Sequence, residues 1–177
     1  MTIGPVLETP RLRLAPPVEE DFDDFAALLG DAQAMATLGG PQPRAMAWRT
    51  FVQTAGSWAL YGFGFFAVRE REGNRFVGRI GCHRPDGWPG TEIGWGLTCE
   101  AQGKGYATEA AGACMDFAVD RLGWGEIVHC IDETNLASQA VARRLGSRVL
   151  RTARLPLPLD KDTVCWGQTA AEWKARR

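Results

Sequence analysis

The segment Gln102-Gly103-Lys104-Gly105-Tyr106-Ala107 constrains the fold of this chain more than any other feature. It lies between a predicted strand and the strongest predicted helix. Its two glycines let the backbone turn tightly and bring N–H groups close to a ligand. The first turn of the helix behind them presents unpaired N–H groups and the positive end of the helix dipole. The segment therefore predicts a strand–turn–helix unit that binds phosphate.

Hydrophobic periodicity places the other elements around this unit. The helix over residues 105–122 has apolar residues at i, i+3 and i+4 along its length, and Gly123 ends it. A Gly73-Asn74 turn between two strand-like runs indicates a hairpin. The remaining helices are predicted at residues 18–29, 45–60 and 137–145 and in the tail from 170. The predicted strands cover residues 7–14, 63–69, 76–82, 91–98, 126–131, 148–154 and 163–168.

This order, β-αα-βββ-α-β-α-ββ, combines an antiparallel first half with a later βαβ unit. It predicts an α/β fold with a single mixed, mostly antiparallel sheet of six to seven strands and helices on both faces. We expect one domain over residues 1–177, because the chain contains no internal repeat and no linker between domains.

Composition excludes several classes of protein. The net charge of -1 provides no basic field for nucleic acid or anionic lipid, and no apolar run is long enough to span a membrane. Met1 to Glu8 lack the basic start and apolar stretch of a secretory signal. The five cysteines form no CxxC pair, so we expect buried thiols in a reducing cytoplasm and neither a metal site nor disulfides.

Two common phosphate-binding motifs fit the segment poorly. A Walker loop requires Lys-Ser or Lys-Thr after its last glycine, whereas Tyr106 follows Gly105. A dinucleotide fingerprint requires a third glycine where this chain has Thr108, and it belongs to an early βαβ unit.

The segment resembles the pyrophosphate loop of the GNAT (GCN5-related) N-acetyltransferases, Gln/Arg-x-x-Gly-x-Gly/Ala, through Gln102, Gly105 and Ala107. Further stretches are similar to the RimJ/RimL-like branch of that family, in the same order. They are Glu8-Thr-Pro-Arg-Leu-Arg-Leu14, Glu92-Ile-Gly-Trp-Gly-Leu97, Ala107-Thr-Glu-Ala-Ala111, Asn135-Leu-Ala-Ser138, Ala142-Arg-Arg-Leu-Gly146 and Glu172-Trp173.

The resemblance implies that the chain binds acetyl-CoA and transfers its acetyl group to an amine. It places the pyrophosphate on the N–H groups of Gly103, Lys104, Gly105, Tyr106 and Ala107, with Gln102 facing the ligand and Thr108 contributing a hydroxyl. The pantetheine arm would lie along Leu97 and Cys99, where the strand at 91–98 splays from the strand at 126–131. Asn135 would contact this arm, although Asn135 also suits a helix N-cap.

The chemistry requires a neutral amine held against the thioester carbonyl, and it needs no covalent enzyme intermediate. The resemblance makes Glu92 the candidate base; Asp132, Glu133, His83 and His129 are its rivals. Many members of the family use a tyrosine after the position of Gly146 as the acid, but this chain has none there. That departure leaves the Ser138 hydroxyl as the candidate acid.

The acceptor would lie among residues 39–44, Trp88 and residues 154–162, and bulky residues there suit either a shaped site or ordinary packing. The resemblance favours a protein or peptide N-terminus, and relatives also acetylate small amines; a homodimer is expected from the family alone. Two other hypotheses stay open: a non-catalytic acyl-CoA-binding sensor on the same fold, which the missing tyrosine favours, and an interaction protein without a cofactor.

Overall fold

A computed structural model describes residues 3–177, so Met1 and Thr2 of the predicted domain lie outside the described residues. The strands are β1 (Leu7–Glu8), β2 (Leu12–Ala15), β3 (Phe65–Glu70), β4 (Phe76–His83), β5 (Glu92–Leu97), β6 (Glu126–Ile131), β7 (Arg148–Arg154) and β8 (Asp162–Thr169). The α-helices are α1 (Phe22–Gly30), α2 (Arg44–Tyr61), α3 (Tyr106–Asp120), α4 (Leu136–Arg144) and α5 (Ala170–Arg176). Short 3-10 turns occupy Glu19–Asp21 (η1) and Cys99–Ala101 (η2).

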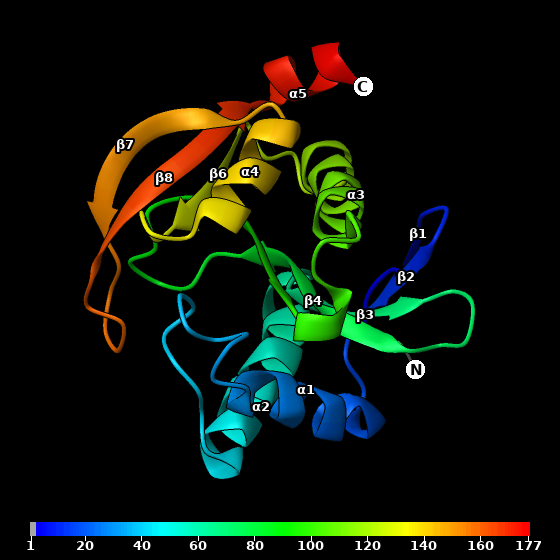
Figure 1. Cartoon of the computed structure of the whole chain (residues 1–177). Coiled ribbons are helices and arrows are strands. Elements are labelled where there is room, and N and C mark those ends of the chain that lie inside the picture. The colour runs from blue at the N-terminus through cyan, green and yellow to red at the C-terminus, as the bar shows by residue number, and fades with distance from the viewer. Residues whose placement is uncertain (1–2) are drawn as a thin grey trace.

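All the strands join one sheet, in the order β1-β2-β3-β4-β5-β6-β8-β7. Every neighbouring pair is antiparallel except β5 and β6, which are parallel. Helices α1 and α2 lie on one side of the sheet, and α3 and α4 lie on the other (Figure 1). The predicted mixed, mostly antiparallel sheet with helices on both faces is confirmed, although it has eight strands and not six to seven.

The additional strand comes from the beginning of the chain. Residues 7–14 were predicted as one strand, and this is wrong, because the chain reverses between Leu7 and Leu14 and pairs these two residues with each other. Thr9 closes the turn: its N–H donates to the carbonyl of Leu12 at 2.9 Å, and its hydroxyl oxygen accepts the N–H of Leu12 at 3.0 Å. Pro10, which cannot donate to a strand ladder, was the sequence signal for this interruption.

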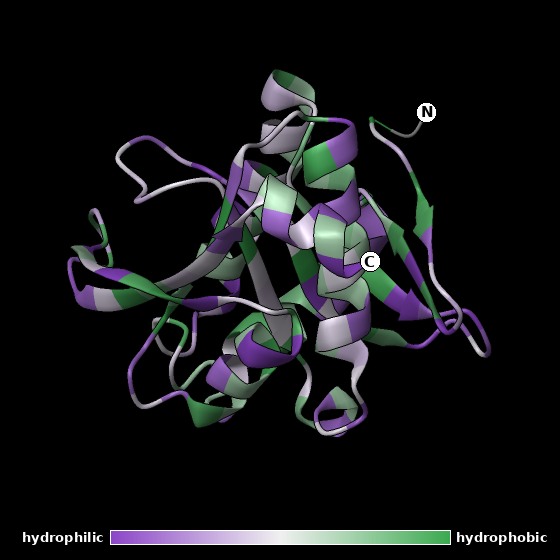
Figure 2. Ribbon diagram, turned by 90° about the horizontal axis from the view of Figure 1, so that it is seen from above, coloured by the Kyte–Doolittle hydropathy of each residue, from purple (hydrophilic) through white to green (hydrophobic). Residues whose placement is uncertain are grey.

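Small side chains let α3 pack close to the sheet. Ala110, Ala111, Cys114 and Ala118 are fully buried in the largest hydrophobic cluster, where they contact residues from β2 to β6. Figure 2 shows hydrophilic and hydrophobic residues mixed along the helix ribbons, as expected for helices with one buried face. Close packing of this kind fixes the start of α3, and therefore the loop before it, against the end of β5.

The other face of the sheet has an aromatic core. Phe25 of α1 packs edge-on against Phe51 of α2, with ring centroids 5.2 Å apart, and against Phe76 of β4 at 5.5 Å. Trp58 of α2 is buried in the other cluster, the one that contains α3, and Trp48 packs on Phe22 near the surface. Both tryptophans therefore serve ordinary packing.

Strands β5 and β6 separate soon after they meet. Their ladder consists of the single pair Glu92↔Val128, supported by the N–H of Val128, which donates to the carbonyl of Thr91 at 2.9 Å. Beyond this pair the two strands diverge, as the predicted splay requires. The divergence opens the sheet beside residues 93–97 of β5.

Candidate active site

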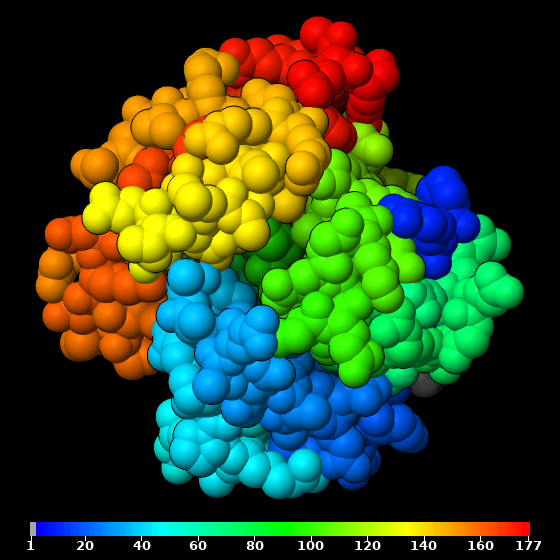
Figure 3. Space-filling view, in the orientation of Figure 1, coloured from blue at the N-terminus to red at the C-terminus, as the bar shows by residue number. Residues whose placement is uncertain are grey.

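A cavity of about 320 Å³ lies at the divergence of β5 and β6. Its lining comes from both faces of the sheet: Glu92, Phe65 and Arg79 lie on the face covered by α1 and α2, whereas Trp95 and Ser138 lie on the face of α4. The cavity therefore passes through the sheet. Figure 3 shows the surface hollowed where the loop before α2 (blue), the start of α4 (yellow) and the loop before α3 (green) approach one another.

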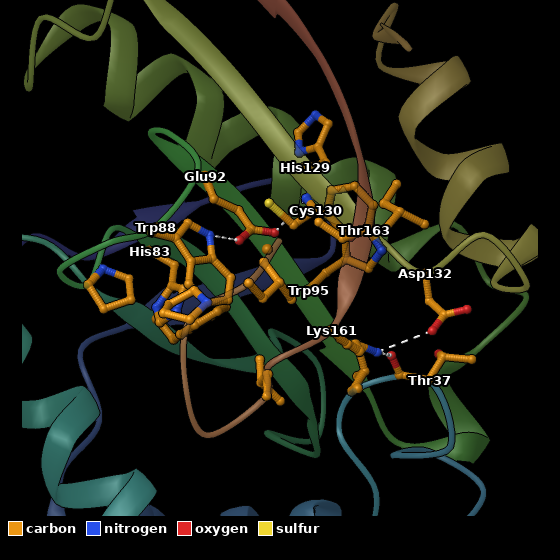
Figure 4. A pocket seen from close by; sticks show the side chains of 18 of the residues that line it. Thr37, His83, Trp88, Glu92, Trp95, His129, Cys130, Asp132, Lys161 and Thr163 are labelled. Atoms are coloured by element: carbon orange, nitrogen blue, oxygen red, sulfur yellow. Dashed lines mark hydrogen bonds and ion pairs between the residues drawn. The ribbon is translucent and has the colours of Figure 1, made fainter. Parts of the chain in front are cut away.

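Glu92 is buried at the start of β5, and its carboxylate takes the place of a missing backbone partner. One carboxylate oxygen accepts the N–H of Cys130 on β6 at 2.9 Å, and the other accepts the indole N–H of Trp88 (Figure 4). Burial raises the pKa of Glu92 from 4.5 to about 7, and these two hydrogen bonds offset only part of that effect. A carboxyl with this pKa changes charge near neutral pH, which suits a general base.

His129 fills the gap between the same two strands from the opposite face. Its Nδ1 lies 2.7 Å from the carbonyl oxygen of Ile93, and its Nε2 lies 3.1 Å from the Ser147 hydroxyl. Burial lowers the pKa of His129 to about 4, so the ring is neutral at neutral pH. Its hydrogen bonds to β5 and Ser147 give His129 a structural role, and it is not available as a base.

The other rivals of Glu92 are less suited to the role of base. The hydroxyl and backbone N–H of Thr134, together with Lys161, lower the pKa of Asp132 to about 2. Burial and the charge of Arg79 lower the pKa of His83 to about 4. Glu133 is exposed and does not line the cavity. Of Glu92, His83, His129 and Asp132, Glu92 has the pKa closest to neutrality.

Ser138 lies in the first turn of α4 and faces the cavity. Its hydroxyl oxygen accepts the indole N–H of Trp95 at 3.1 Å, so its own proton stays free to donate. The side chain of Asn135 accepts the N–H of Ser138 at 2.9 Å, as an N-cap, and donates to the Thr37 hydroxyl at 2.6 Å. Asn135 therefore caps α4 and ties it to the loop before α2, and it also lines the cavity.

The loop before α3 presents free N–H groups. Gly103 and Gly105 have left-handed backbones, with φ of 75° and 81°, and open space surrounds Gly103. Within residues 3–177, no backbone N–H from Gly103 to Thr108 donates a hydrogen bond to a backbone or side-chain acceptor. These N–H groups stand at the positive end of a helix of 15 residues. The arrangement fits a bound pyrophosphate.

The side chains of the loop differ in where they point. Tyr106 is buried, and its hydroxyl donates to Glu70 at 2.6 Å, so only its backbone faces the loop. Ala107 is buried as well, whereas Gln102 and Lys104 are exposed. Arg11 secures the loop by donating to the carbonyl of Lys104 at 3.0 Å.

Leu97 and Cys99 are placed differently from each other. Leu97 is the last residue of β5, beside the gap. Cys99 lies beyond the strand in the 3-10 turn η2, with its sulfur 3.7 Å from a carboxylate oxygen of Asp31. Of the two backbones expected along the pantetheine arm, only that of Leu97 belongs to the strand.

Several cavity residues were not identified from the sequence, among them Arg79, Phe65 and Thr163. Arg79 had a signal, because it is a charged residue in the otherwise apolar strand Phe76–His83. Phe65 and Thr163 had none, because strands commonly contain such residues. The segments that were expected to surround the acceptor do contribute to the cavity lining, through Gln42, Trp88 and much of residues 154–162.

The sequence model of a protein family, described as the acetyltransferase (GNAT) domain, matches residues 11–148, which is more than half of the chain. The chain belongs to the GNAT acetyltransferase family. Members of this family transfer acetyl groups from acyl-CoA. Among residues 3–177 there is no cluster of His, Cys, Asp and Glu side chains that could hold a metal ion, and no helix that could cross a membrane.

The relatives of this GNAT chain include proteins from several bacteria. It is 28% identical to the uncharacterized protein YkkB of Bacillus subtilis over 153 residues, covering 84% of this chain and 88% of that one. A crystal structure of an acetyltransferase from Agrobacterium tumefaciens is 29% identical, with a TM-score of 0.81 over 93% of this chain and 94% of that one. The ribosomal-protein-S5-alanine acetyltransferase of Vibrio fischeri has a TM-score of 0.75 over 96% and 98% of the two chains, and at 16% identity it shows a shared fold alone.

Proposed function

We propose that this protein is an acetyl-CoA-dependent N-acetyltransferase in which a primary amine attacks the thioester directly. One observation carries the proposal: Glu92 and Ser138 reach the same cavity from opposite faces of the sheet. A base on one face and a proton donor on the other suit an amine and a thioester that meet in the gap.

The residues have distinct roles in this proposal. The free N–H groups from Gly103 to Thr108, with the Thr108 hydroxyl, bind the pyrophosphate, and the edge of β5 at Leu97 pairs with the pantetheine arm. Asn135 holds the start of α4 beside this arm. Acetyl-CoA supplies the activated thioester when bound. Glu92 accepts a proton from the amine, and Ser138 donates one toward the departing sulfur.

Several finer expectations belong to the same proposal. The single sheet supports one domain over residues 1–177, and five unpaired cysteines suit a reducing compartment such as the cytoplasm. The motifs shared with the RimJ/RimL-like branch support that branch. A homodimer stays a prediction that rests on the family.

Release of free thiol from acetyl-CoA, measured with a panel of peptides and small amines, tests the proposal. Turnover with any amine is expected. Tight binding of CoA in calorimetry without turnover on any acceptor would favour the non-catalytic sensor. Among the described residues, the cavity lining contains no tyrosine, which also favours the sensor.

A further inference from the structure

Arg79 is a cation without a protein partner. It lies in the middle of β4 and lines the cavity, with its guanidinium 4.7 Å above the Phe65 ring. No hydrogen bond or ion pair joins its side chain to any residue between 3 and 177. Arg69 on the adjacent strand is different, because it pairs with Asp21 at 2.8 Å and with Asp24 at 2.6 Å. A half-buried guanidinium without a carboxylate partner is costly for the fold.

The surroundings of Arg79 do not neutralise it. Burial lowers its pKa to about 10, so it stays charged near neutral pH. The acid close enough to act on it is Glu92, whose oxygens are bound to Trp88 and Cys130. His83 stays neutral in the field of Arg79. Arg79 therefore keeps its charge in the cavity, and no carboxylate among residues 3–177 forms an ion pair with it.

Two glycines of β5 separate Glu92 from the position opposite Arg79. Glu92, Gly94 and Gly96 alternate along one face of β5, and Gly96 is the register partner of Arg79. The Phe65 ring packs over Gly94, where a Cβ would stand 3.1 Å from it, and Leu38 packs over Gly96, where a Cβ would stand 3.4 Å from it. The four residue steps from Glu92 to Gly96 span about 13 Å of strand, and Glu92 and Arg79 stand at the two ends of this stretch of β5.

Thr163 of β8 is a second polar group without a partner in the same cavity. It is 4% exposed, and within the described chain its Oγ1 makes no hydrogen bond (Figure 4). Because a buried hydroxyl without a partner costs free energy, its position is explained if a bound reactant supplies the partner.

We propose that Arg79 binds a carboxylate carried by the acceptor, so that the preferred acceptors are amino acids or other small amines bearing a carboxylate. This inference rests on the proposed acetyl transfer. Arginine presents a planar pair of donors that matches a carboxylate, and an amine held near Glu92 then has its carboxylate anchored at Arg79, in the same cavity. The Thr163 hydroxyl hydrogen-bonds a further polar group of the reactants. A carboxylate on the acyl group would have the same chemistry, and the experiment below separates the two sources.

The test compares acceptors in matched pairs, each an amino acid and its carboxamide, by thiol release from acetyl-CoA. For the wild type, kcat/KM is expected to favour the carboxylate member. In Arg79→Gln, kcat/KM for that member is expected to fall about 10- to 100-fold, as for loss of a charge-assisted hydrogen bond, with little change for the carboxamide. Arg79→Lys is expected to retain part of the preference. Arg13→Gln, which removes an exposed arginine of β2 outside the cavity, is the matched control.

Three outcomes would overturn the inference. One is an equal loss of kcat/KM for both members of each pair in Arg79 variants whose circular dichroism spectra show that they are folded. Another is a wild type that acetylates carboxamides as well as carboxylates. The third is an Arg79→Gln variant that loses only transfer from succinyl-CoA to uncharged amines, because the anion then belongs to the acyl group. If CoA binds but no amine of either kind is acetylated, the proposed function itself fails. Calorimetry of the amino acids with the CoA-bound wild type and Arg79→Gln then decides the role of Arg79 separately.

Discussion

At the scale of single residues, the reactivity of this site depends on the surroundings of Glu92. The Glu92 carboxylate accepts the N–H of Cys130 on β6, which in a continuous ladder would donate to a backbone carbonyl. Burial raises the pKa of Glu92 to about 7. The neighbouring cavity groups titrate elsewhere: the pKa of His83 is about 4, that of Asp132 is about 2 and that of Arg79 is about 10. The carboxyl of Glu92 therefore changes its protonation state near pH 7, whereas the protonation states of these neighbours do not change there.

Replacing Glu92 by Gln is expected to lower kcat/KM by about 10- to 1000-fold above pH 7, the range for loss of a general base. Wild-type kcat/KM should rise with pH and change slope near pH 7, where the Glu92 carboxyl loses its proton. The variant should lack this change of slope, and its affinity for CoA should be unchanged, because Gln can still accept the Cys130 N–H. Glu133→Gln, at an exposed carboxylate outside the cavity lining, is the control. A variant with the same pH profile as the wild type would remove Glu92 from the role of base.

At the scale of elements, the start of α3 combines a helix terminus with two left-handed glycines. Gly105 occupies the N-cap position without a side-chain cap, so the first N–H groups of the helix remain free. Arg11 and Thr9 fix this end of the helix through Glu109, which accepts the Thr9 hydroxyl at 2.6 Å and the Arg11 Nε at 2.7 Å. The loop is held in place before any ligand binds.

Gly105→Ala is therefore expected to weaken CoA binding by about 10-fold or more, because φ of 81° is strained for an L-residue and the N–H groups must shift. Gly123→Ala is the matched control. Gly123 has φ of 69°, lies in open space and follows the other end of the same helix. Calorimetry with CoA and thermal unfolding separate affinity from stability. Equal CoA affinities in the two variants would contradict the assignment of the loop.

At the scale of the whole molecule, the two halves of the sheet are joined by side chains as much as by backbone. The ladder between β5 and β6 has one pair, and His129 adds its bonds to the carbonyl of Ile93 and to Ser147. Ser147 in turn accepts from Gln168 of β8 at 3.0 Å. This buried network holds the divergence of the strands at a fixed width.

The network makes stability depend on pH. The pKa of His129 is 6.5 without burial and about 4 in the folded protein, so between these values the unfolded chain binds a proton that the folded protein does not. Stability from neutral His129 is present above pH 6.5 and is lost as the pH falls toward 4. In urea denaturation, the advantage of the wild type over His129→Asn should shrink by about 2 kcal/mol between pH 7 and pH 5. Effects of other groups, Glu92 and His83 included, cancel in this difference. An advantage that does not change with pH would contradict the prediction.

The sequence by itself determined the features that depend on local chemistry. Helix periodicity and turn residues predicted the element order, and the glycines at 103 and 105 predicted a tight turn before α3 that both φ values support. The interruption at Pro10 was missed, because the short strands on either side of it read as one continuous pattern.

Only the tertiary structure decided how distant residues act on one another. The pKa of Glu92 depends on burial against Trp88 and Cys130, and Arg79 lacks a partner only because of which strands surround it. The choice of Glu92 over His83 also rests on these contacts between elements. Local propensity is a property of neighbours along the chain, whereas burial and charge pairing depend on residues that only folding brings together.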